Sequence, residues 1–349
     1  MRTRATELFG VRHPIVQTGM GYVSGARLTS ATANAGGLGI LASATMSYDE
    51  LAAAIAETKS RTSNPFGVNL RADAPDAVER IELMAREGVR VASFALAPKK
   101  DLIARCKDHG MVVMPSIGAK RHAEKVAEWG VDAVIVQGGE GGGHTGAVPT
   151  TLLLPQVVDA VDIPVIAAGG FFDGRGLVAA LAYGAEGIAM GTRFLLTSDS
   201  AVSDAVKQTY LEKSVADTVV TTEVDGVPHR VLRTPFVEDL LKSRAVGRLV
   251  RAGRNALAFQ RMSHTPWKDV VSEGLAMRKS AELTLSQVVM AANTPMLLKA
   301  AMVDGRPDLG VMASGQVVGL IDDLPSCQEL LDRIMKEADD VLGRLRDRA

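Results

Sequence analysis

Short apolar runs recur from Pro14 to about Thr197, and a longer amphipathic stretch follows most of them. The runs are rich in Val, Ile and Ala and lack polar alternation, which is typical of strands buried on both faces of a parallel sheet. They are PIVQTGM (from Pro14), LGILAS (from Leu38), PFGVNL (from Pro65), VRVASFAL (from Val89), MVVMPSIG (from Met111), VDAVIVQGG (from Val131), IPVIAAGG (from Ile163) and AEGIAMGTRF (from Ala185).

The stretches between the runs have helical patterns, as in SYDELAAAIAETKSR and KRHAEKVAEWG. Several of these predicted helices end in a glycine just before the next run, a position that suits a left-handed cap; these are Gly88, Gly110, Gly130 and Gly184. Eight strand-like runs with intervening helices predict an α/β fold, a (β/α)8 TIM barrel. An open doubly wound sheet is the alternative that this pattern leaves open.

The repeating pattern ends after Thr197. SDAVKQTYLEKS predicts a helix, and TVVTTEVDGVPHRVL predicts two short strands around Asp225-Gly226, a dipeptide favoured in tight hairpins. A basic, helical stretch follows, and the chain ends on the amphipathic pattern CQELLDRIMKEADDVLGRL, which could complete the ring of barrel helices. We therefore expect residues 1–200 and 303–349 to form the barrel, and residues 201–302 to form an inserted α+β lid or substrate domain.

Composition narrows the class of protein. The chain is 47% hydrophobic with a net charge of −1, so it has material for a large core and no bulk field for nucleic acid or membrane. Its two cysteines, Cys106 and Cys327, form neither a disulfide framework nor a zinc pattern. The N-terminal segment lacks an apolar core typical of a secretory signal, and the apolar runs are too short to cross a membrane. We expect a cytoplasmic protein.

The C-terminal ends of the predicted strands should carry the chemistry, as in other barrels of this kind. These ends are rich in glycine, amides and hydroxyls and lack a spaced cluster of histidines and acids, so we expect no metal. Gly169-Gly170 and Gly191-Thr192 follow the seventh and eighth runs, where glycine backbones can bind a phosphate. Glycines that only allow tight turns are the alternative explanation.

The segment QGGEGGGHTG, from Gln137 to Gly146, has six glycines in ten residues and contains His144. Such a segment is costly to order and suits a backbone that passes close to a ligand. Because His144 is flanked by glycine at a predicted strand end, we favour a role as general acid or base over a structural role.

Six segments resemble successive motifs of the nitronate monooxygenase (2-nitropropane dioxygenase) family: HPIVQTGMG, PFGVNL, VIVQGGEGGGHTG, IPVIAAGGFFDGRG, AMGTRFL and ASGQVVGLIDD. The resemblance runs from about His13 to Thr197 and resumes near Asp308. It implies an FMN-binding TIM barrel with an inserted lid and His144 as the catalytic base. The FMN contacts that it implies are Met20, Asn69, Ser116, Gln137, Gly143, Gly170, Gly191 and Thr192.

RTPFVEDL, MAANTPMLLKA and LPSCQELL are most similar to an actinobacterial branch of this family that acts late in steroid (cholesterol) breakdown. That similarity implies an acyl-CoA substrate, with desaturation of 5-hydroxy-7a-methyl-1-oxo-octahydroindene-carboxyl-CoA and NAD as the electron acceptor. The main alternative is a nitronate monooxygenase, which would use the same histidine and flavin but pass the electrons to oxygen. EGGGHTG and QTGMG differ from the forms common in nitronate-oxidising members, and this difference argues against nitronate activity. A quinone or enoyl reductase and a non-catalytic flavin-binding module are further alternatives.

Between Lys242 and Lys279 the chain carries many basic residues and few acids. Arginines spaced by four, three and three residues share one helix face; they are Arg244, Arg248, Arg251 and Arg254. They could bind the phosphates of CoA, for which arginine is well suited, or form a solvated face. The oligomeric state stays open, and a homo-oligomer is possible.

Overall fold

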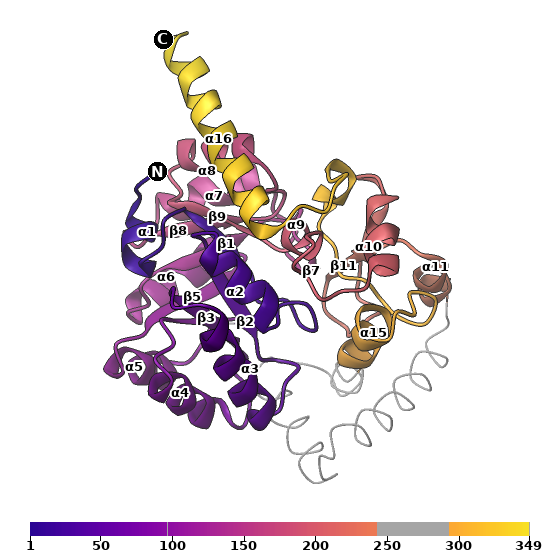
Figure 1. Ribbon diagram of the computed structural model, residues 1–349, viewed down its shortest axis with the longest axis horizontal. Helices are drawn as coiled ribbons and strands as arrows, with labels where there is room; N and C mark the ends of the chain where they lie inside the picture. The colour runs from indigo at the N-terminus through magenta and orange to yellow at the C-terminus, as the bar shows by residue number, and fades with distance from the viewer. Residues whose placement is uncertain (96, 243–292, 349) are drawn as a thin grey trace. The chain divides into compact units, whose positions relative to one another are not determined.

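The computed structural model describes residues 1–95, 97–242 and 293–348 (Figure 1). These residues divide into two compact units. The barrel unit comprises Met1–Gly141, Thr145–Ala201 and the chain from Leu320 onward. The second unit comprises Gly142–His144 and the described part of Val202–Gly319, so three residues after the sixth barrel strand belong to it.

Eight parallel strands close into a barrel, and each pairs with the next along the chain until the last pairs with the first. The predicted (β/α)8 barrel is therefore confirmed, and the open sheet is wrong for this chain. The strands are β1 (Ile15–Gln17), β2 (Leu38–Ala42), β3 (Phe66–Leu70), β4 (Val91–Phe94), β5 (Val112–Ile117), β6 (Val134–Gln137), β8 (Val165–Ala168) and β9 (Gly187–Met190).

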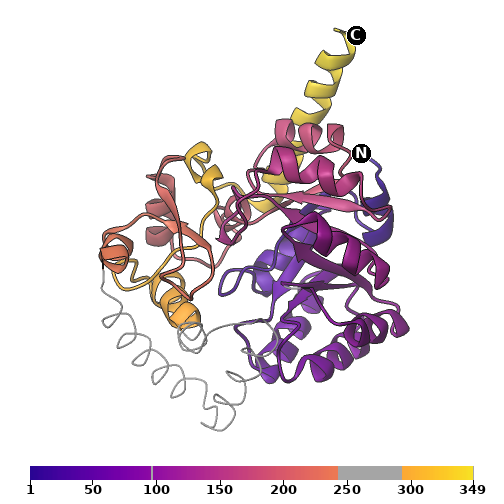
Figure 2. The same ribbon diagram turned by 180° about the vertical axis from the view of Figure 1, so that it is seen from behind.

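Helices surround the strands in both views (Figure 1; Figure 2). They are α1 (Arg4–Phe9), α2 (Ala26–Asn34), α3 (Tyr48–Arg61), α4 (Ala77–Arg86), α5 (Lys100–Asp108), α6 (Lys120–Glu128), α7 (Thr150–Val158), α8 (Gly174–Ala182), α9 (Thr192–Leu195) and α16 (Cys327–Arg346). The predicted left-handed glycines that end four of them are confirmed, with φ from +72° to +89°. The last helix, α16, packs against α8 and α2 and completes the ring, as its amphipathic pattern suggested.

The barrel core consists of side chains that the strands direct inward, including Val16, Ile40, Met114 and Ile166. Phe9 of α1 packs into the same cluster and is 1% exposed. This apolar filling makes the barrel interior a packed core rather than a channel. The chemistry must therefore lie at a rim of the barrel.

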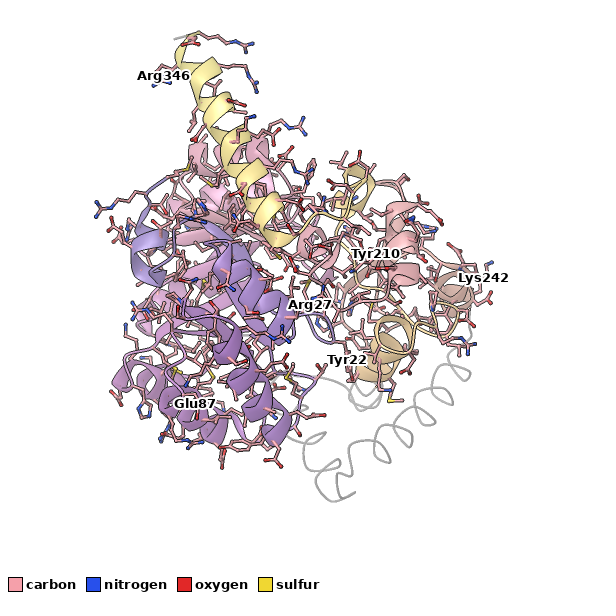
Figure 3. All side chains as sticks on the ribbon, viewed as in Figure 1. Tyr22, Arg27, Glu87, Tyr210, Lys242 and Arg346 are labelled. Carbon is pink, nitrogen blue, oxygen red and sulfur yellow. The ribbon has the colours of Figure 1, made fainter. Side chains whose placement is uncertain are left out.

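The second unit has a three-stranded sheet with the order β10 (Thr218–Thr221), β11 (His229–Leu232), β7 (Gly143–His144). β10 and β11 are antiparallel, which confirms the hairpin predicted around Asp225-Gly226. Its described helices are α10 (Asp204–Leu211), α11 (Pro235–Lys242) and α15 (Asn293–Met302), and the short 3-10 helix Gln316–Leu320 follows. Tyr210 of α10, labelled in Figure 3, is fully buried, and its hydroxyl donates to Ala313 O at 2.8 Å.

Within the part of the chain that the structure describes, no helix combines the length and the apolar character needed to span a membrane.

Candidate functional site

The barrel unit brings seven of the eight residues that the resemblance assigned to FMN to one rim. They lie at or just after the C-terminal ends of strands that all run in the same direction. They are Met20 after β1, Asn69 on β3, Ser116 on β5, Gln137 on β6, Gly170 after β8, and Gly191 and Thr192 after β9. Gly143, the eighth, lies in β7 of the second unit.

Close packing fixes the rim where β1 and β3 end. A Cβ atom on Gly19 would lie 2.5 Å from the Cβ of Asn69, so only glycine lets the loop after β1 lie against this side chain. The Nδ2 of Asn69 donates to the Oγ of Ser93 at 3.3 Å, and the backbone N–H of Met20 donates to the Oγ of Ser24 at 2.9 Å. Asn69 is 8% exposed and is therefore held as a nearly buried amide at the rim.

Thr150 links the ends of β6 and β8. Its N–H donates to the Oε2 of Glu140 at 3.0 Å, and its Oγ1 lies 2.7 Å from the same oxygen. A Cβ on Gly138 would overlap Thr150, and a Cβ on Gly141 would lie 2.6 Å from the Nε2 of Gln137. Part of the glycine content of residues 137–146 is therefore explained by close approaches within the protein.

Gly169 and Gly170 follow β8 with φ angles of +98° and +84°. Residues other than glycine rarely adopt positive φ angles, and two consecutive residues with such angles are uncommon. Neighbouring backbone N–H groups in such turns form concave sites for anions. The turn contains Gly170, which the resemblance assigned to an FMN contact.

His144 makes a close side-chain contact with Asp225 within the second unit. Its Nε2 lies 2.6 Å from the Oδ2 of Asp225, although the two residues are 81 positions apart. The side chain of His144 is 57% exposed, whereas that of Asp225 is 5% exposed. A buried carboxylate therefore holds one ring nitrogen of an accessible imidazole.

His229 lies on the other side of the same carboxylate. Its Nδ1 is 3.6 Å from the Oδ2 of Asp225, and its ring centroid is 4.7 Å from that of His144. Burial alone would raise the pKa of Asp225, but the two imidazoles outweigh it and hold that pKa well below its usual range. Burial lowers the pKa of His229, while the neighbouring Asp225 opposes this shift.

The three side chains could also serve as metal ligands, since one atom from each lies within 4.8 Å of the others. The distance of 2.6 Å between Nε2 and Oδ2 is that of a direct charge-assisted hydrogen bond. Sequence reasoning identified His144 but missed Asp225 and His229. In the sequence, Asp225 has only the character of a turn residue. Its contact with His144 depends on the pairing of β7 with β11, which no local pattern predicts.

The four arginines assigned to the CoA phosphates, Arg244, Arg248, Arg251 and Arg254, lie outside the described residues.

Comparisons with known proteins show what this chain is similar to. The family model described as nitronate monooxygenase matches residues 2–82 and 76–337. A Mycobacterium tuberculosis protein named (3aS,4S,5R,7aS)-5-hydroxy-7a-methyl-1-oxo-octahydro-1H-indene-4-carboxyl-CoA dehydrogenase is 67% identical over 341 residues, covering 97% of this chain and 96% of its own. A Rhodococcus jostii protein of the same name is 64% identical, with 99% of both chains covered.

Solved structures are similar over nearly the whole chain. FabK from Thermotoga maritima is 34% identical with a TM-score of 0.81 and covers 100% of both chains. A nitroalkane oxidase from Streptomyces ansochromogenes is 26% identical with a TM-score of 0.76 and covers 97% of this chain and 99% of its own. The match of the family model to most of the chain, on a barrel with glycine-rich strand ends, shows that the protein belongs to the nitronate monooxygenase family of flavin oxidoreductases.

Proposed function

We propose that this protein is an FMN-dependent acyl-CoA dehydrogenase that desaturates 5-hydroxy-7a-methyl-1-oxo-octahydroindene-4-carboxyl-CoA, a bicyclic product of steroid breakdown. The observation that carries the proposal is the 67% and 64% identity, over nearly the full chain, to two actinobacterial proteins named for this substrate. Identity at this level over nearly the whole chain supports a shared substrate in addition to a shared fold.

FMN suits the barrel rim. The phosphate would bind at the turn of Gly169 and Gly170, supported by Gly191 and Thr192 at the neighbouring strand end. Amide and hydroxyl groups of Asn69, Ser116 and Gln137, together with Met20, would line the rest of the site from other strands. When bound, FMN supplies a two-electron acceptor for the hydride that leaves the β carbon of the thioester.

The protein supplies the base. His144 would take the proton from the carbon α to the thioester carbonyl, whose acidity the thioester raises. Neutral imidazole is suited to this step near neutral pH. Gly143, which has a φ of +72°, keeps the backbone beside His144 free of a Cβ atom and would border the flavin.

Two parts of the proposal concern groups outside the described site. NAD would accept the electrons that leave the flavin, and Arg244, Arg248, Arg251 and Arg254 would bind the phosphates of CoA through charge-assisted hydrogen bonds. Both parts rest on the sequence resemblance and the arginine spacing.

Nitronate oxidation is the second candidate, and the similarity to a nitroalkane oxidase structure favours it. Both reactions would transfer electrons to the flavin, but an alkyl nitronate is already deprotonated at the carbon next to its nitrogen and needs no proton removal. They differ in substrate and in the final electron acceptor.

An anaerobic comparison of the two substrates distinguishes them. The purified protein should be yellow, and the indane carboxyl-CoA should bleach its flavin absorbance faster than an alkyl nitronate at the same concentration. Faster bleaching by the nitronate would replace the proposal with the second candidate. A protein that neither contains nor binds FMN would remove both.

A further inference from the structure

The turn between β10 and β11 holds the Asp225 carboxylate rigidly. The residue before it, Val224, is fully buried in the core of the second unit, as is Val231 on β11. Gly226 has a φ of +87°, and its N–H donates to Thr222 O at 2.8 Å. The N–H of Val227 donates to the Oδ1 of Asp225 at 3.1 Å, so one carboxylate oxygen is fixed by the turn itself.

The other oxygen, Oδ2, is directed at the His144 ring. β7 pairs with β11 so that His144 lies opposite His229, which brings the ring to the hairpin turn. A carboxylate can only accept a hydrogen bond, so the Nε2 of His144 carries the proton in the contact of 2.6 Å. In the neutral ring the lone pair is then on Nδ1.

Burial strengthens this contact. At 5% exposed, the carboxylate has little water to compete for its charge. A second ionisable side chain against it, His229, is 3% exposed, and its Nδ1 lies at the longer distance of 3.6 Å. The Nη1 of Arg230, also on β11, donates a hydrogen bond to the Oγ1 of Thr218 at 2.9 Å.

We propose that Asp225 is the positioning residue of the catalytic base: it holds His144 in the tautomer with Nε2 protonated, so that Nδ1 takes the substrate proton. This inference rests on the proposed function and deepens it. When His144 takes the proton its ring becomes a cation, and the adjacent buried anion stabilises that cation without itself accepting the proton. The turn and the sheet would therefore set the direction in which the base faces.

A double-mutant cycle tests whether Asp225 acts through His144. Asp225→Asn should slow flavin reduction by the acyl-CoA at least about tenfold, with little change in KM, because it removes the charge but keeps the shape. In the His144→Ala background the same change should have almost no further effect, since residues that act as a unit are not additive. Asp239→Asn, an exposed aspartate on α11 of the same unit, is the matched control and should leave the rate unchanged.

Equal losses from Asp225→Asn with and without His144 would show a general structural effect and overturn the inference. So would a metal ion that purifies at one equivalent with the wild type and is absent from Asp225→Asn.

Imidazole nitrogen NMR provides a readout that does not depend on the substrate. With histidine nitrogens labelled, and His144 assigned by its loss in His144→Ala, the wild type should show the proton on Nε2. Asp225→Asn should show a mixture of the two tautomers. A wild type with the proton on Nδ1 would overturn the inference even if acyl-CoA turnover is observed. Failure of the acyl-CoA to reduce the wild-type flavin would instead reject the proposed function and leave this NMR result standing.

Discussion

At the scale of single residues, the proposed chemistry depends on some features that the sequence predicts and on others that only the fold shows. His144 was identifiable because glycines flank it after a predicted strand. The role of Asp225 was not identifiable, because its partner, His144, is 81 positions away in the sequence and lies in a strand of only two residues. A histidine in an unusual local setting is visible in sequence, whereas the carboxylate that orients it is visible only in the fold.

The role of His144 is testable by its removal. His144→Ala should keep the flavin and its absorbance spectrum, because His144 is not among the residues proposed to bind FMN. It should slow flavin reduction by the acyl-CoA by roughly a hundredfold or more, the range expected for loss of a general base. Stopped-flow absorbance under anaerobic conditions measures the rate, and an unchanged rate would make His144 a structural residue.

At the scale of elements, the eight apolar runs predicted the eight barrel strands because buried parallel strands need apolar residues on both faces. β7 escaped prediction because two residues contain no periodicity. The glycine-rich segment was predicted to approach a ligand. The structure shows that Gly138 lies directly against Thr150 and that Gly141 lies directly against the side chain of Gln137, so neither position has space for a Cβ atom.

The turn after β8, which contains Gly169 and Gly170, should bind the phosphate of FMN. Gly170→Ala places a Cβ at a φ of +84° and should cost about 1–2 kcal/mol of folding free energy and lower FMN affinity as well. Gly130→Ala is the matched control, because its φ is +87° and a Cβ there would meet nothing within 4 Å. Thermal unfolding should shift similarly in both variants, but only Gly170→Ala should weaken FMN binding in a fluorescence titration. Equal FMN affinities would place the phosphate elsewhere.

At the scale of the whole molecule, the reactivity of the two cysteines should show whether the barrel unit is folded. Cys106 on α5 and Cys327 on α16 are fully buried, and burial raises the pKa of each thiol to about 12. Since the thiolate is the reactive form, neither should react quickly with a thiol reagent while the barrel is folded. The composition indicated a protein with free thiols, and it could not show that both would be buried beneath helices of the same barrel.

FMN should protect these thiols further. If labelling requires unfolding, FMN at about 100 times its Kd stabilises the folded state by about 2.7 kcal/mol and should slow labelling about a hundredfold. The rate of thiol modification with and without added FMN, measured on flavin-depleted protein, checks this. A rate of thiol modification that does not change with FMN would mean that the barrel opens without disturbing the flavin site, or that FMN does not bind there.

The central claim is that this flavin barrel removes two hydrogens from an indane carboxyl-CoA. It is tested most directly by a single anaerobic turnover with excess enzyme, followed by mass spectrometry of the thioester. The account predicts one equivalent of product lacking two hydrogen atoms for each flavin reduced, with almost none formed by His144→Ala. An unchanged thioester beside a fully oxidised flavin, in a preparation that oxidises an alkyl nitronate, would contradict it.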